Sequence, residues 1–139
     1  MLTTWTTPKT DWAYTDFINY TDYNRIVGNV EYIIALANQL EEDTYPSLTT
    51  KTGYLDYPYA SEWNAVENCV SKLATKAGIS YVKQTYMNNG FTIDANELNN
   101  IESMELTLKG IFEAAISMKY RLAYTFGRKR SEVTIGARI

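Results

Sequence analysis

Apolar residues recur every three or four positions in three stretches of the chain. That spacing places them on one face of an α-helix, and this face must be buried. The pattern predicts helices over about 20–42, 60–77 and 95–126. The predicted apolar faces are Tyr23, Ile26, Val30, Ile33, Ala37 and Leu40 in the first helix; Trp63, Val66, Val70, Leu73 and Ala77 in the second; and Leu98, Ile101, Met104, Leu108, Ile111, Phe112, Ala115, Met118 and Leu122 in the third.

The ends of these predicted helices carry capping residues. Asn19 precedes the first helix with Asp22 three residues later, and Asp94 precedes the third with Glu97 at the same spacing. In such a pair the first side chain accepts a backbone N–H bond and the acid bonds back to the first residue. Gly78, just past the second helix, is a typical C-cap because glycine adopts the left-handed conformation without strain.

The end of the chain has a different period. After Gly127, apolar residues alternate with polar ones through Val133, Ile135 and Ile139, which is typical of a β-strand. We therefore expect residues 127–139 to form an extended arm. A lone strand has no partner in a chain of three helices, so this arm is expected to pair with a neighbouring molecule.

A short pattern occurs at the start of each predicted helix: an acid, a large apolar residue, an asparagine, any residue and an aliphatic residue. Repeats separated by 40 and 35 residues, as these are, indicate repeated supersecondary units. We divide a helical domain, residues 1–126, into units of about 9–42, 51–78 and 83–126, followed by the arm at 127–139. The three copies are Asp22-Tyr23-Asn24, Glu62-Trp63-Asn64 and Glu97-Leu98-Asn99.

Aromatic lead-ins precede the three copies, and the breakers Pro46, Gly53 and Pro58 mark the first connection between helices. We expect long, extended, aromatic-rich straps between the helices. The lead-ins are Lys9–Trp12, Lys51–Tyr54 and Lys83–Tyr86. The aromatic residues of the first strap, expected to anchor it and to contribute to an assembly interface, are Trp5, Trp12, Tyr14 and Phe17.

The repeated Asn24, Asn64 and Asn99 allow two interpretations. Together with the neighbouring acids they resemble sites for a ligand or a cation. Alternatively, each amide bonds the backbone of the incoming extended segment, while each acid caps its helix at the positively polarised end. Because three near-identical sites at three helix starts are more than one catalytic centre needs, we favour the structural interpretation.

Catalytic chemistry has little support in the composition. The chain has no histidine, which removes the commonest general base and metal ligand. Its one cysteine, Cys69, excludes an internal disulfide and a cysteine-based zinc site. Carboxylate pairs suited to glycoside hydrolysis exist in any acidic protein and single out no residue. We expect no enzyme activity, no metal and no cofactor.

Nor does the sequence predict a membrane partner. Met1–Trp5 lacks the basic region and the apolar run of a signal peptide, and no apolar stretch is long enough to cross a bilayer.

The net charge of −3 hides an asymmetry along the chain. Residues 1–118 hold 7 basic and 15 acidic residues, whereas residues 119–139 hold 6 basic residues and one acid. The basic end suggests nucleic-acid binding or docking on an acidic neighbour. We favour docking, because the acidic body would repel phosphates. Arg128, Lys129, Arg130, Val133 and Ile135 are therefore assigned to an assembly interface.

The first copy also resembles a known motif. Residues Asp22 to Tyr32 are similar to a "D-x-N-R-I-x-x-N-I-x-x-L" helix start found in tail, baseplate and fibre-associated proteins of phages and prophages of Gram-positive bacteria. There the motif often follows a Lys-x-x-Trp lead-in, as Lys9 and Trp12 do here. Residues Asn96 to Glu102 are similar to the same motif, whereas the second copy departs from it at Trp63. The resemblance covers about half of the chain and implies a virion component.

The sequence therefore predicts an all-α fold of three amphipathic helices joined by straps, with a C-terminal arm. We expect a non-enzymatic structural subunit of a phage tail or baseplate, made in the host cytoplasm and located in the virion. Its expected partners are other phage structural proteins and further copies of itself. The alternatives are a receptor-binding module for host cell-wall saccharide and a nucleic-acid-binding adaptor.

Overall fold

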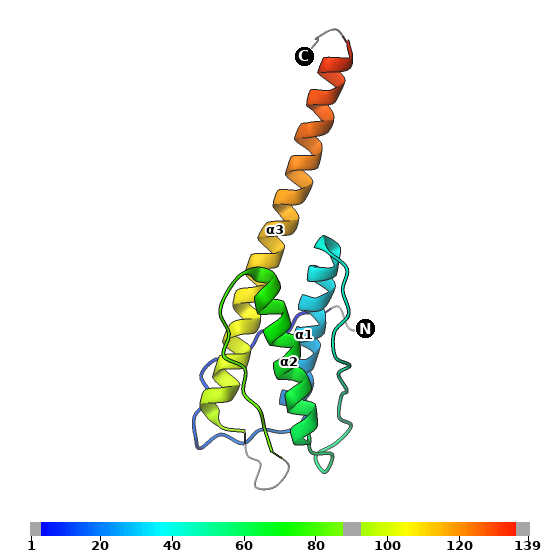
Figure 1. Ribbon diagram of the computed structural model, residues 1–139. Coiled ribbons are helices and arrows are strands. Elements are labelled where there is room, and N and C mark those ends of the chain that lie inside the picture. Colours follow the sequence, from blue (N-terminus) through cyan, green and yellow to red (C-terminus); the bar gives the residue numbers. More distant parts are fainter. Residues whose placement is uncertain (1–3, 88–92, 136–139) are drawn as a thin grey trace.

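The described part of the chain folds into three α-helices, and the prediction of an all-α fold is confirmed. The computed structural model describes residues 4–87 and 93–135, with side chains up to Thr125. The helices are α1 (Tyr20–Leu40), α2 (Ala60–Ala77) and α3 (Ala95–Ile135), as Figure 1 shows. The described ranges contain no strand.

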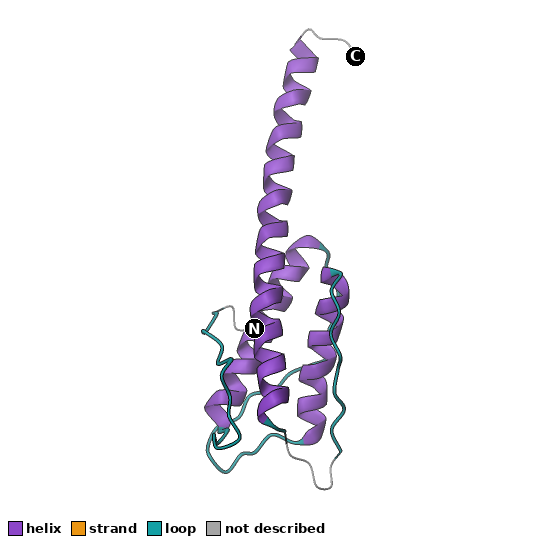
Figure 2. Ribbon diagram, turned by 90° about the vertical axis from the view of Figure 1, so that its left-hand side faces the viewer, coloured by secondary structure: helices purple, strands orange, loops and turns teal. Residues whose placement is uncertain are grey.

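All three helices run in the same direction (Figures 1 and 2). They begin at one end of the bundle, which we call the base. A connection between parallel helices must return over the full length of the bundle, about 30 Å for a helix of 21 residues. Strap 2 (41–59) and strap 3 (78–87 and 93–94) make these returns, and strap 1 (4–19) precedes α1.

The predicted apolar faces form one core between the helices. Tyr23 and Trp63, the large apolar residues of the first two repeats, are at most 1% exposed, and their rings meet edge to face at 5.1 Å. Burying rings of this size is a main source of stability in a small domain. Leu98 of the third repeat is also buried. The three repeats therefore place their first apolar residue in the core next to the base.

The helix boundaries follow the predicted caps. The Asn19 side chain accepts a hydrogen bond from the backbone N of Thr21 at 2.9 Å, and the Asn19 N–H donates to Asp22 at 3.0 Å. Asp94 and Glu97 form the reciprocal pair at the start of α3, at 3.0 and 2.9 Å. Gly78 ends α2 with a φ of 76°, a left-handed conformation that only glycine adopts easily.

The predicted extended arm is wrong for residues 127–135, which continue α3 as a helix. Helix α3 has 41 residues, and Arg128, Lys129, Arg130, Val133 and Ile135 all lie in it. Residues 4–87 and 93–135 offer no sheet edge, so a helix satisfies the backbone N–H and C=O groups within the segment, which an unpaired strand cannot do. Residues 136–139 of the predicted arm lie outside the described residues.

Candidate functional site

Each repeated asparagine holds a strap at the base of the bundle. Its amide N–H donates to a backbone carbonyl of the strap, and its carbonyl accepts the backbone N–H of the same strap residue. This two-bond contact, which we call a clasp, satisfies both backbone groups of an extended segment that has no sheet partner. The clasps are Asn24 with Lys51 at 2.8 and 2.8 Å, Asn64 with Tyr86 at 3.1 and 2.8 Å, and Asn99 with Trp12 at 3.0 and 2.7 Å.

The clasps do not join each helix to the strap that leads into it, as the sequence suggested. Asn24 and Asn64 hold the straps that follow their helices, because a returning strap passes the start of the helix it has just left. Asn99 of α3 holds strap 1, so each of the three straps is bonded to a helix that does not follow it directly in the chain. The register of the second lead-in also differs: Lys51, not Tyr54, takes the place of Trp12 and Tyr86.

A fourth clasp, which sequence reasoning missed, joins Asn29 of α1 to Thr6 of strap 1. The two bonds measure 2.9 and 2.7 Å. Asn29 is fully buried on a face that is otherwise apolar. A polar residue between Ile26 and Ile33 is the signal that points to it, since buried amides need partners.

Glu102 of α3 is the most connected buried side chain at the base. Its carboxylate accepts hydrogen bonds from the Lys9 backbone N at 3.1 Å and the Trp12 Nε1 at 2.6 Å. The Arg25 guanidinium binds it through two nitrogens, both at 2.9 Å, and also reaches Asp22 at 2.9 Å. One carboxylate therefore joins α1, α3 and strap 1.

Glu67 of α2 has the equivalent role for strap 3. It accepts hydrogen bonds from the hydroxyls of Tyr81 at 2.5 Å and Tyr86 at 2.6 Å, and it is fully buried. Burial, together with this carboxylate, raises the pKa of both tyrosines. Glu67 and Glu102 each follow a clasp asparagine by three residues, and this spacing was the available signal. The first repeat has Val27 at this position, so only two of the three repeats show the spacing.

Glu105, one turn after Glu102, is fully buried, and neither of its oxygens has a hydrogen-bond partner among the described residues. Burial and the nearby charge of Glu102 raise the pKa of the Glu105 carboxyl well above its ordinary value of 4.5. Arg25 and the amide of Asn29 oppose this shift without cancelling it. Burial therefore favours the protonated form of Glu105, because an unpaired charge in the core costs far more than a neutral acid.

These buried groups suit a structural role better than a chemical one. The clasps and the Glu102 and Glu67 contacts use their polar atoms within the chain, and Glu102, Glu105 and Glu67 are inaccessible to solvent. Among the described residues, no three histidine, cysteine or acidic side chains are grouped to bind a metal.

Replacing Asn64 by alanine is expected to destabilise the fold by about 1–3 kcal/mol, because the N–H and C=O of Tyr86 lose their partners in a partly buried place. Urea unfolding measures the change. The matched control is Asn68→Ala on the same helix. Asn68 is exposed, and its side-chain oxygen accepts a hydrogen bond from the Lys83 ammonium, not from the backbone of a strap. Equal unfolding midpoints for both variants would contradict a structural role for the clasp.

The base carries two neighbouring apolar hollows, which share Ile18 and Ile93. One, of about 280 Å³, is lined by Tyr57 and Trp63, and the other, of about 310 Å³, by Trp12 and Phe17. Of the predicted interface aromatics, Trp12 is buried and Trp5 packs on the ring of Tyr32 within the chain. Tyr14 and Phe17 are 79% and 92% exposed, so they are available to a partner at this surface.

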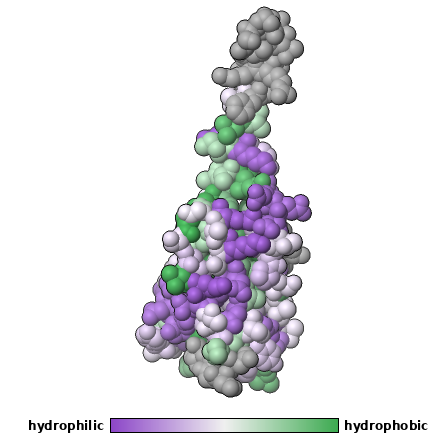
Figure 3. Space-filling model, viewed as in Figure 1, coloured by the Kyte–Doolittle hydropathy of each residue, from purple (hydrophilic) through white to green (hydrophobic). Residues whose placement is uncertain are grey.

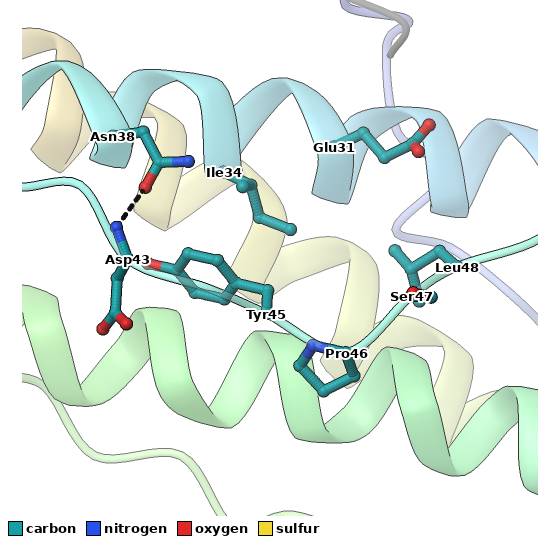
Figure 4. A pocket seen from close by; sticks show the side chains of 8 residues that line it. All are labelled: Glu31, Ile34, Asn38, Asp43, Tyr45, Pro46, Ser47 and Leu48. Atoms are coloured by element: carbon teal, nitrogen blue, oxygen red, sulfur yellow. Dashed lines mark hydrogen bonds between the residues drawn. The ribbon is translucent and has the colours of Figure 1, made fainter.

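A further hollow of about 310 Å³ lies between α1 and strap 2 (Figure 4). The ring of Tyr45 lies between α1 and α2, and the Asn38 side chain accepts a hydrogen bond from the backbone of Asp43 at 3.0 Å. Burial raises the pKa of Glu31 on the α1 side. The bonded groups of this hollow hold strap 2 against α1.

Beyond Ile116, the last residue of α3 that packs on the core, α3 continues past the ends of α1 and α2 (Figure 1). We call residues 117–135 the α3 extension. Residues 117–125 are all exposed, including Met118, Tyr120, Leu122 and Tyr124. Figure 3 shows apolar residues on this narrow part of the molecule. Lys119 still reaches the Gln39 carbonyl at 2.8 Å, which marks the edge of the bundle.

Comparisons with family models, curated proteins and solved structures found no match to this chain. In the described part of the chain, no helix has an apolar segment of the length that a bilayer requires.

Proposed function

We propose that the protein is a non-enzymatic structural subunit of a phage tail or baseplate, located in the virion and acting through contacts with other subunits. The observation that carries this proposal is the α3 extension. It leaves the bundle with Met118, Tyr120, Leu122 and Tyr124 between 46% and 67% exposed. Apolar surface of this kind on a soluble domain marks a place of association.

The length of the extension strengthens the argument. Nineteen helical residues, from 117 to 135, span about 28 Å. An isolated helix of this size is only marginally stable in water, and most helices in proteins are held by packing of one face. Met118 and Leu122, four residues apart, share one face of the extension, and a partner that covers this face stabilises the helix. Its basic residues favour an acidic partner, in keeping with a C-terminal segment that docks on a neighbouring protein.

The class of particle comes from the sequence motif. Asp22, Asn24, Arg25 and Asn29 match the helix start found in phage tail, baseplate and fibre-associated proteins, and this resemblance favours a virion over other assemblies. The proposed partners are other phage structural proteins and further copies of this chain. The clasps support the same proposal because they brace a bundle whose straps would otherwise be loose.

Replacing Leu122 and Tyr124 by glutamate is expected to leave the bundle folded and to prevent incorporation into phage particles. Both side chains are exposed in the free chain, so circular dichroism and thermal unfolding of the bundle should change little. Incorporation is measured by complementing a phage that lacks the protein. Val82→Glu, at an 81% exposed position of strap 3, is the matched control. Normal incorporation of the Leu122/Tyr124 variant would refute the proposed role of the extension.

A second candidate function is recognition of host cell-wall saccharide at the base. Exposed aromatic rings beside carboxylates suit sugars, because a ring packs on the apolar face of a sugar and an acid accepts its hydroxyls. Tyr14, Phe17 and Asp16 line one hollow in this way. Titration of cell-wall polysaccharide into the protein and into Phe17→Ala tests this candidate. Equal heats for both proteins would exclude the hollow as a saccharide site.

A further inference from the structure

Charge is divided along the long axis of the molecule. Around the base, in the first two turns of the helices, the nearby strap residues and Glu102, which binds Arg25, acids outnumber basic residues by eight to three. Residues 119–135 of α3 include five basic residues and one acid. The acids of the base are Asp11, Asp16, Asp22, Asp56, Glu62, Asp94, Glu97 and the buried Glu102, and its basic residues are Lys9, Arg25 and Lys51.

The three basic residues of the base are already engaged. Lys9 pairs with Asp11 at 3.1 Å and Asp16 at 3.6 Å, Lys51 pairs with Glu62 at 2.8 Å, and Arg25 binds Asp22 and Glu102. The Asp11 side chain remains 86% exposed despite its ion pair. The base therefore keeps an excess of negative charge that faces solvent.

The two ends also complement each other in their apolar residues. The base has two adjoining hollows that share Ile18 and Ile93, with Phe17 standing exposed beside them. The α3 extension presents Met118 and Leu122, which are four residues apart on one helix face and are 53% and 46% exposed. Hollows of about 300 Å³ accommodate side chains of this size.

We propose that the α3 extension of one molecule docks on the base of a second copy, head to tail. Two extensions paired with each other would bring together two segments that both carry excess positive charge, which costs energy in either orientation. Extension on base joins opposite charges and covers apolar surface on both sides. Such a contact leaves one free base and one free extension, so it continues into a ring or a filament. This inference rests on the proposed assembly role and names the neighbour.

The test uses two full-length variants, each with one end disabled. The extension variant is Arg128→Glu/Lys129→Glu/Arg130→Glu, and the base variant is Asp11→Lys/Phe17→Lys. Glu42→Lys/Val82→Lys is the control, because it changes the net charge as much as the base variant does, at exposed positions away from the base. Circular dichroism establishes that all of them keep their helices. Sedimentation velocity at low salt measures association.

We expect the wild type and the control to associate with rising concentration, and each disabled variant to remain monomeric. An equimolar mixture of the two disabled variants should form a heterodimer and nothing larger, because one intact extension and one intact base remain. Added salt should weaken all association.

A monomeric wild type at the highest soluble concentration, or a mixture that stays monomeric, would overturn the proposal. So would a base variant that associates like the wild type. If that same variant also loses polysaccharide binding, the base is a saccharide site and not a docking surface. Phage complementation remains a separate measure, so the structural role can survive the loss of the head-to-tail contact.

Discussion

Replacing Glu102 by alanine is expected to destabilise the bundle by about 3–5 kcal/mol, the range for breaking a buried ion pair. The carboxylate is fully buried, and its loss leaves the Arg25 guanidinium and the Trp12 Nε1 without their shared acceptor. Strap 1 also loses the bond at Lys9. Urea unfolding followed by circular dichroism measures the change. In the native variant, exposure of the Trp12 indole should also shift the tryptophan fluorescence.

A surface carboxylate on the same helix serves as the control. Glu113 pairs with Lys109 at 3.0 Å with its side chain 42% exposed, so Glu113→Ala should cost at most about 1 kcal/mol. The double variant Arg25→Ala/Glu102→Ala should be more stable than the sum of the single effects predicts, since it removes both charges together. Strict additivity would show that the two residues act independently.

Replacing Glu105 by glutamine is expected to remove a large part of the pH dependence of stability. In the unfolded chain this carboxyl loses its proton near pH 4.5, whereas burial raises its folded-state pKa well above that value. Between the two pKa values the folded protein binds one proton more than the unfolded chain. The free energy of unfolding therefore falls as the pH rises from about 4.5 through the raised pKa.

Glutamine has nearly the same volume and no charge, so the variant should gain stability relative to the wild type as the pH rises, with the difference smallest below pH 4.5. Denaturant unfolding at a series of pH values measures this difference. Glu31 and Glu97, whose pKa values are also raised by burial, contribute slopes of the same sign in both proteins and cancel in the comparison. Parallel curves for the two proteins would show that Glu105 is ionised in the core.

The helices were predictable because each encodes its own ends and its own apolar face. Asn19, Asp94 and Gly78 mark boundaries through local hydrogen bonds and backbone conformation, which depend on a few neighbouring residues. The three repeats predicted that Asn24, Asn64 and Asn99 occupy equivalent places. These features are all local, and local physics is what a single sequence expresses most directly.

The partners of the straps were not predictable in the same way. Asn99 finds Trp12 across 87 residues of chain, and Glu102 finds Lys9 across 93. The direction of packing decides such contacts, and no spacing in the sequence specified that the helices run parallel. The prediction for the C-terminal segment was wrong because Val133 and Ile135 alternate with polar residues as in a strand. The described part of the chain has no sheet edge to pair with, and the backbone of residues 127–135 forms its bonds within a helix.

The seating of strap 1 on the last helix sets an order for folding during synthesis. Trp12 is made before α1 and α2, yet its clasp partner Asn99 and its carboxylate acceptor Glu102 lie on α3, which is made after both. Helices α1 and α2 can pair as soon as they emerge, while strap 1 waits for α3. Contacts so distant along the chain slow the final step of folding. In an incomplete chain that stops before residue 99, strap 1 therefore lacks its binding site on α3. The indole of Trp12 then stays accessible to quality-control factors.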